Sequence, residues 1–279
     1  MSVDSLGRAE DLDELFRQSN PRRSDTGVEF DLPEDPGHIY PSDKIDEYPY
    51  SGQRRYYGQF TYYFTDWKGR DQDETGQFEY RAESGLFLIS MESERIDARD
   101  IIEEINSQMP EKSEIRGSLS VRRKPLWDFF DEADQYDELV ISGPEGKFDF
   151  RTLKHAAQRM GPDDLRELKQ MDEAKAQQRQ GEADKIETII PLLDRTDLTT
   201  EISSLNDLGI DRTKYFIERA DVGFEYDSEL VEVRYDRGEL NIPEPTTKDV
   251  DTEEETRIDC LEYVVQLFET KVVYPSYGK

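Results

Sequence analysis

The chain has 279 residues, of which 65 are acidic and 36 basic, giving a formal net charge of −29 at pH 7. Its single cysteine, Cys260, excludes an intramolecular disulfide and a cysteine-based metal site. No apolar run reaches the roughly 18 residues of a membrane span, and the N-terminus lacks signal-peptide features, so we expect a cytoplasmic protein.

Residues 1–55 are predicted to form a mostly flexible N-terminal arm. The stretch 9–18 fits a short acidic helix, and the alternation of Val28, Phe30 and Leu32 fits an added edge strand. Elsewhere in the arm, prolines recur so closely that no regular element is expected between them. These are Pro21, Pro33, Pro36, Pro41 and Pro49.

Residues 56–153 are predicted to form a mixed-sheet domain with packed helices. Aromatic residues alternate from Tyr56 to Phe64, which indicates a strand with one buried face. The full predicted order is strand 56–64, loop 68–76, strand 77–81, buried strand 85–90, helix 97–109, strand 115–121, helix 125–136, and a hairpin over 139–150.

Residues 154–209 are predicted to be a helical connector, because large apolar side chains are sparse along its helical pattern. Residues 210–279 are predicted to be a smaller α+β unit. Strand patterns at 214–217 and 222–226 precede a hairpin over 230–242. Thr252 and Glu255 then form a capping box for a helix in which Cys260 is buried. The predicted fold class is therefore α+β.

The excess of acidic residues affects the salt concentration at which the chain can fold. At about 0.15 M salt the Debye length is about 8 Å, so neighbouring carboxylates repel one another, whereas at about 1 M it is about 3 Å. The composition resembles that of proteins from salt-accumulating microbes. An acidic disordered chain is the alternative, but 15 Tyr, 13 Phe and 2 Trp favour a folded protein.

Two groups of residues could bind nucleic acid. The strand pattern containing Arg54, Arg55, Tyr57 and Tyr63 combines guanidinium groups for phosphates with rings on which bases stack. An aromatic, half-exposed sheet face is the structural alternative. The second group is the densest basic cluster in the chain and could equally form ion pairs with the acidic surface. It comprises Arg116, Arg122, Arg123 and Lys124.

A metal-dependent nuclease is a further hypothesis, because such enzymes use carboxylates to hold a divalent ion and a lysine to stabilise charge. Glu145 and Lys147, with Asp137 or Asp149, fit this pattern superficially. The pattern falls on a Gly-Pro turn, and an acidic chain produces such matches by chance.

Other kinds of site have little support in the sequence. His38 and His155 suggest neither a metal site nor a catalytic triad. The phosphate-binding glycine motifs of nucleotide-dependent proteins are missing. We therefore predict no metal and no cofactor.

The sequence thus favours a non-enzymatic interaction or regulatory protein of a salt-adapted cytoplasm, with a protein partner or self-association. The contact elements expected are the helix at 162–190 and the aromatic strand. A nucleic-acid-binding or nuclease-like protein of genome defence or a mobile element is the alternative.

Overall fold

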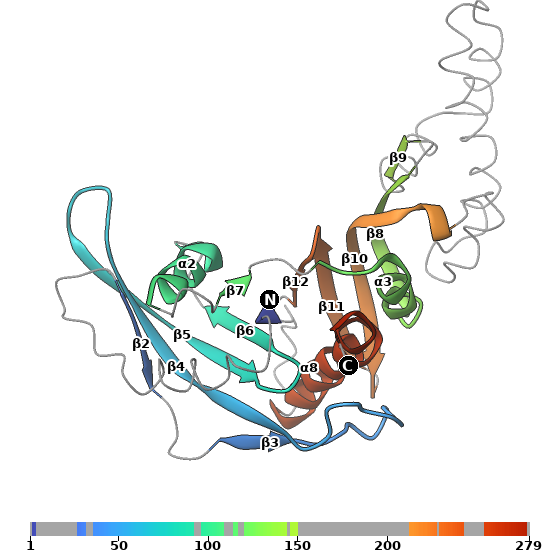
Figure 1. Ribbon diagram of the computed structural model, residues 1–279, viewed down its shortest axis with the longest axis horizontal. Coiled ribbons are helices and arrows are strands. Elements are labelled where there is room, and N and C mark those ends of the chain that lie inside the picture. The colour runs from blue at the N-terminus through green and yellow to red at the C-terminus, as the bar shows by residue number, and fades with distance from the viewer. Residues whose placement is uncertain are drawn as a thin grey trace, which may run out of the picture. The chain divides into compact units, whose positions relative to one another are not determined.

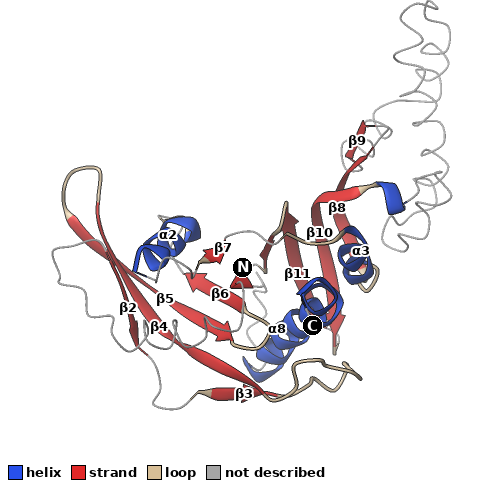
Figure 2. Cartoon of the chain, viewed as in Figure 1, coloured by secondary structure: helices blue, strands red, loops and turns tan. Residues whose placement is uncertain are grey.

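The computed structural model describes residues 2–3, 27–31, 36–91, 96–108, 114–116, 120–143, 146–149, 212–227, 229–242 and 254–277. Strands and a few helices make up most of these residues, so the α+β class is confirmed. The chain divides into two compact units. Unit 1 contains residues 1–120 and 277–279, and unit 2 contains residues 121–276. Figures 1 and 2 show the elements of both units.

Unit 1 is built on one antiparallel sheet. Its described strands are β1 (Ser2–Val3), β2 (Gly27–Asp31), β3 (Gly37–Ile39), β4 (Gln53–Thr65), β5 (Asp71–Arg81), β6 (Leu86–Met91) and β7 (Ile115–Arg116). The strand order is β2-β4-β5-β6-β1-β7, and β3 also pairs with β4. The sheet thus places residues near the N-terminus beside strands that are distant in sequence.

The longest pairing in unit 1 is the hairpin of β4 and β5, which continues without a break from Arg55 opposite Arg81 to Thr65 opposite Asp71. The predicted loop at 68–76 is therefore wrong, since the turn occupies only residues 66–70 and β5 already begins at Asp71. The sequence of this half-strand is polar because its side chains alternate between exposed and half-buried, so no apolar face marks it as a strand.

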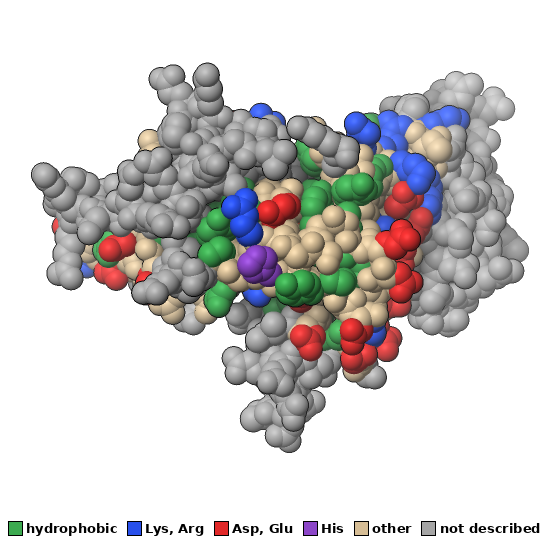
Figure 3. Space-filling model, turned by 60° about the horizontal axis from the view of Figure 1, so that its bottom comes forward, with side chains coloured by type: hydrophobic (Ala, Val, Ile, Leu, Met, Phe, Trp, Pro, Cys, Tyr) green, Lys and Arg blue, Asp and Glu red, His purple; other side chains and the backbone are tan. Residues whose placement is uncertain are grey.

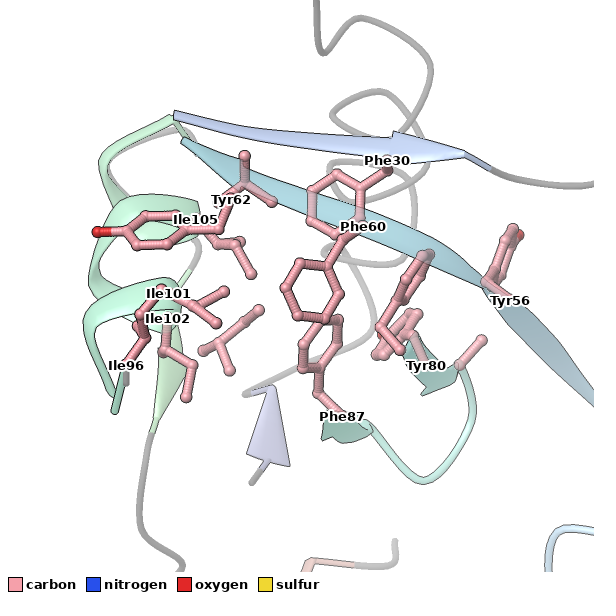
Figure 4. Packing of buried hydrophobic residues seen from close by; sticks show 14 residues of the cluster. Phe30, Tyr56, Phe60, Tyr62, Tyr80, Phe87, Ile96, Ile101, Ile102 and Ile105 are labelled. Atoms are coloured by element: carbon pink, nitrogen blue, oxygen red, sulfur yellow. The ribbon is translucent and has the colours of Figure 1, made fainter. Parts of the chain in front are cut away.

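The core of unit 1 lies on one face of this sheet, beneath helix α2 (Ala98–Gln108). Every second residue of β4 faces inwards, and α2 contributes three buried isoleucines spaced for one helix face. Figure 4 shows the rings from β2, β4, β5 and β6 stacked beside these isoleucines. The labelled residues are Phe30, Tyr56, Phe60, Tyr62, Tyr80, Phe87, Ile96, Ile101, Ile102 and Ile105.

The arm predicted over 1–55 is in part an ordered component of unit 1. The edge strand expected around Val28 and Phe30 is confirmed as β2, but β3 lies between Pro36 and Pro41, where no element was expected. Ile45 and Tyr48 in the following turns are buried, because backbone hydrogen bonds such as that from Ile45 N to Ser42 O (3.0 Å) hold these turns. The residues at 4–26, including the predicted helix 9–18, lie outside the described part.

Unit 2 is also built on an antiparallel sheet, with the strand order β12-β11-β10-β8-β9. Its strands are β8 (Gln135–Gly143), β9 (Gly146–Asp149), β10 (Phe216–Tyr226), β11 (Glu229–Asp236) and β12 (Glu239–Asn241). The helical elements are α3 (Arg123–Phe130), the 3-10 turn η1 (Arg212–Lys214), α8 (Glu254–Phe268), the π-helix η2 (Glu269–Val273) and α9 (Tyr274–Tyr277).

The core of unit 2 brings α3 and α8 against the same strands. The Phe129 ring on α3 lies 5.0 Å from that of Phe224 on β10 and 5.2 Å from that of Phe268 on α8. Cys260 on α8 is buried, as predicted, and its thiol donates to the Tyr226 carbonyl at 3.7 Å. The hairpins expected at 139–150 and 230–242 and the C-terminal helix are confirmed. Helix α3, however, ends at Phe130 and not near 136, because β8 begins at Gln135.

Two features of the predicted organisation need correction. All pairings among the described strands are antiparallel, so the sheets are not mixed there. The predicted boundary between 56–153 and 210–279 also differs from the division observed, since β8 pairs directly with β10 in one sheet. The predicted connector at 154–209 lies outside the described residues.

Candidate contact surface on unit 1

The face of the unit 1 sheet that points away from α2 carries three of the predicted nucleic-acid residues. Side chains alternate along a strand, so Arg55, Tyr57 and Tyr63 share this outward face of β4. The register places Tyr57 opposite Glu79 and Tyr63 opposite Asp73 on β5. Arg54 lies on the other face, where its Nε pairs with Glu83 at 3.2 Å. The hydrogen bond with Glu83 raises the pKa of Arg54. The four residues therefore do not form one site.

The two arginines on this outward face, Arg55 and Arg81, form ion pairs with one carboxylate, that of Glu79. Glu79 accepts a hydrogen bond from Arg55 Nε at 2.8 Å through one oxygen and from Arg81 Nε at 2.6 Å through the other. Arg81 is only 1% exposed and stands directly opposite Arg55 in the sheet. The carboxylate between them offsets the repulsion between two like charges in directly opposed positions.

Tyr57 is held in place and remains accessible. Its ring is 46% exposed, the guanidinium carbon of Arg55 lies 5.1 Å from the ring centroid, and its edge approaches Gly37 on β3. A cation over a ring contributes about 0.5–1 kcal/mol at exposed sites. Tyr63 at the far end of the face donates a hydrogen bond to Glu29 at 3.0 Å. The surface is thus aromatic, with Arg55 and Glu79 paired locally.

The turn at residues 66–70 presents a tryptophan that the sequence analysis did not single out. Trp67 is 88% exposed, and the Lys68 ammonium lies 4.5 Å from its ring centroid. The short run Asp66-Trp67-Lys68-Gly69 directly after the alternating segment 56–64 was the available signal. Asp and Gly are turn formers, and a loop of this kind is typical of a hairpin. We call Arg55, Tyr57, Glu79 and the Trp67 turn the hairpin surface.

The predicted basic cluster is divided between the units and engaged in local contacts. Arg116 on β7 of unit 1 lies 3.9 Å from Glu114. In unit 2, Lys124 pairs with Asp128 at 2.5 Å. Arg122 donates to the Pro275 carbonyl at 3.4 Å, while Arg123 donates to the Thr213 carbonyl and lies over the Phe216 ring. These contacts match the ion-pairing and structural alternative.

The nuclease-like set is described only in part. Glu145 lies outside the described residues, and the structure describes Lys147 and Asp149 only as backbone of β9. Asp137 is exposed on β8 at a bulge, since Glu138 pairs with Asp221 while Tyr136 pairs with Val222. Within the described residues, His, Cys, Asp and Glu form no group of three or more that could hold a metal ion.

Asp221 is the most unusual carboxylate near this bulge. Burial raises its pKa above the ordinary 3.8, and the carboxylate of Glu138 opposite raises it further, while Arg234 and Arg219 act in the other direction. Arg219 is itself engaged with Glu138 at 3.3 Å. This is a charged network on the sheet, and we assign it no catalytic role.

Charges of both signs are interspersed over the described surface, and Figure 3 shows acidic side chains gathered along one border of one face. His38 is exposed on β3, opposite Arg54, whereas His155 lies outside the described residues. None of the helices in the described ranges combines the length and the apolar character of a bilayer-spanning segment.

No protein-family model, curated protein or solved structure matches this chain.

Proposed function

We propose that the protein is a non-enzymatic interaction protein of a salt-rich cytoplasm and that it binds a protein partner through the hairpin surface. The observation that carries the proposal is Tyr57, an exposed residue whose ring lies against the Arg55 guanidinium and beside Gly37 on a continuous two-stranded ribbon. Tyrosine and arginine are enriched among the residues that dominate binding energy. A ring that already packs against neighbouring groups before binding also loses less conformational entropy on contact.

Arg55 and Arg81 are already paired with Glu79, which supports a contact surface whose binding persists at high salt concentration. Interactions between exposed charges separated by several ångströms weaken as the Debye length falls to about 3 Å near 1 M salt. Burial of apolar surface is strengthened by some salts and does not depend on unscreened charge. Because Arg55 and Arg81 share Glu79 on this face, binding here would depend mainly on the aromatic area.

The nucleic-acid alternative has less support from the arrangement of its residues. Binding of phosphates by basic side chains weakens steeply with salt. The eight predicted residues also lie on two faces of β4 and in two units, and those of the basic cluster contact neighbouring groups in the same unit.

The experiment is to isolate complexes of the tagged full chain at about 1 M KCl, where surface charges are screened, purify the recovered protein and measure its Kd by titration calorimetry. Tyr57→Ala should weaken binding by about tenfold or more, as for a residue that contributes at least about 1.4 kcal/mol. Thr75→Ala, an exposed change on the same hairpin, is the matched control. Equal Kd values for Tyr57→Ala and wild type would contradict the proposal, as would binding of a single-stranded oligonucleotide that Tyr57→Ala abolishes.

A further inference from the structure

The turn between β4 and β5 carries Trp67 and is held by hydrogen bonds to Asp66. Asp66 Oδ1 accepts hydrogen bonds from the backbone N–H groups of Lys68 (2.8 Å) and Arg70 (2.9 Å). Its Oδ2 accepts from Arg70 Nε (2.9 Å) and Nη2 (2.7 Å). The backbone adds hydrogen bonds from Gly69 N to Asp66 O and from Asp66 N to Arg70 O, both of 2.9 Å. One carboxylate therefore organises the whole turn.

The glycine in this turn is required by its backbone conformation. Gly69 has φ of +72°, a region that side chains other than glycine adopt only with strain. The Asp66 carboxylate is held ionised, because its hydrogen bonds with the Arg70 side chain and then with the Arg70 backbone lower its pKa. The turn is thus built to keep one shape.

The turn also lies at the end of the sheet. Strand β2 pairs with β4 only over residues 59–63, and β6 pairs with β5 only over residues 76–81, whereas β4 and β5 remain paired to residues 65 and 71. Figure 1 shows the connection between β4 and β5 extending past β2. A large ring that is 88% exposed at the end of an ordered ribbon has the features of a binding anchor.

The charges around the ring restrict the kind of partner. Residues 65–75 contain four carboxylates and two cations, a net charge of −2. The charged residues are Asp66, Lys68, Arg70, Asp71, Asp73 and Glu74. Arg70 is occupied by Asp66, so a phosphate chain would meet mainly acidic side chains. A second copy of this chain would place the same carboxylates against them at contact distance, where screening by salt is least complete.

We infer that Trp67 is the anchor of the contact and that it inserts into an apolar pocket, bordered by Lys or Arg side chains, on a different protein. The inference rests on the proposed function and adds the chemistry of the partner. On insertion the Lys68 ammonium leaves the ring for solvent or for the partner surface. The basic border of the pocket then faces the carboxylates of β5.

Photo-cross-linking tests this inference. The full chain is produced with p-benzoylphenylalanine in place of Trp67, or in place of the exposed Tyr40 as control, and irradiated in an extract of the source cells. A cross-link from position 67 to one protein, mapped to an apolar pocket with a basic border and missing from position 40, is the expected result. Cross-links only to nucleic acid or to another copy of this chain would overturn the inference, and so would equal cross-linking from both positions.

Affinity then separates this inference from the proposed function. The cross-linked protein is purified and titrated with the full chain at about 1 M KCl. Trp67→Ala should weaken Kd about 30-fold or more, as expected for a residue that dominates an interface. Tyr40→Ala, which removes another exposed ring in unit 1, should leave Kd within about twofold. Binding that depends on Tyr57 but not on Trp67 overturns this inference alone, whereas binding that depends on neither overturns both.

Discussion

The Phe60 ring on β4 lies directly over Gly76, its partner on β5. A β-carbon at position 76 would lie 2.6 Å from Phe60 Cζ and 2.5 Å from the Ser90 carbonyl oxygen on β6. Real side chains do not tolerate such distances. Glycine at this position therefore allows three strands and a core ring to pack together, and it fixes where the buried part of the β4–β5 ribbon begins.

Gly76→Ala should destabilise unit 1 by about 1–3 kcal/mol, the usual effect of overpacking a core. Gly37→Ala is the matched control, because a β-carbon there makes contacts of 3.5 Å or more at a strand position without a positive φ. Chemical denaturation of both variants in salt gives the comparison. Equal free energies of unfolding for Gly76→Ala and Gly37→Ala would contradict the packing described.

Trp127 joins α3 to the start of β10 in unit 2. It is buried, its Nε1 donates to the Tyr215 carbonyl at 3.0 Å, and the Arg212 guanidinium carbon lies 5.2 Å from its ring centroid. Trp127→Phe leaves that carbonyl without this donor and should reduce stability by about 1–3 kcal/mol. Trp67→Phe, at an exposed ring, should change stability by less than about 0.5 kcal/mol. Thermal unfolding of the two variants checks this contrast.

The network at the β8 bulge predicts a stability that depends on pH. Because the folded pKa of Asp221 is raised above 3.8, its ionised form opposes folding. The penalty is missing below the unfolded pKa and grows as the pH rises through the folded pKa. Asp221→Asn should therefore stabilise the protein at pH 7 but not near pH 3. Denaturation curves at several pH values test this, and a stabilisation independent of pH would argue against the assignment.

The predicted influence of Glu138 on Asp221 can be separated in the same experiment. Glu138→Gln removes the opposing carboxylate that raises the pKa of Asp221. The gain from Asp221→Asn should then be smaller in the Glu138→Gln background than in the wild type. Additive effects of the two changes would show that the carboxylates do not interact.

From the strand pairing of unit 2 we predict that this unit folds without residues 150–211. Val140 pairs with Asp149 on one side and with Arg219 on the other, so the strands that precede and follow this stretch, β9 and β10, belong to one sheet. Two strand spacings amount to about 10 Å, which a Gly/Ser linker of about ten residues can span. The shortened chain should keep cooperative unfolding and its circular dichroism signal from β-structure. Loss of both would indicate that the stretch is needed for the core.

Local patterns in the sequence predicted the elements that have one buried face. The alternation Phe60-Tyr62 and the isoleucine spacing of α2 are direct consequences of burial, so β4 and α2 could be predicted. The first half of β5 has no fully buried residue and lacks such a pattern. The pairing of β8 with β10 joins residues more than 70 positions apart, and no local signal encodes it.

The same distinction explains the candidate site. Arg55 and Tyr57 were found because residue type alone suggests binding. The ion pair of Arg55 with Glu79 could not be predicted, because it depends on the register between β4 and β5. Trp67 was overlooked because it fell between the predicted strand 56–64 and the predicted loop 68–76, whereas the structure places it in the turn at 66–70.

The proposed adaptation to salt is tested by the free energy of unfolding of the purified full chain, measured between about 0.1 M and about 1 M KCl. The Debye length falls from about 10 Å to about 3 Å over that range. With a net charge of −29, the chain should become progressively more stable as its carboxylates are screened. A free energy of unfolding that is unchanged or decreases across the range would contradict the account.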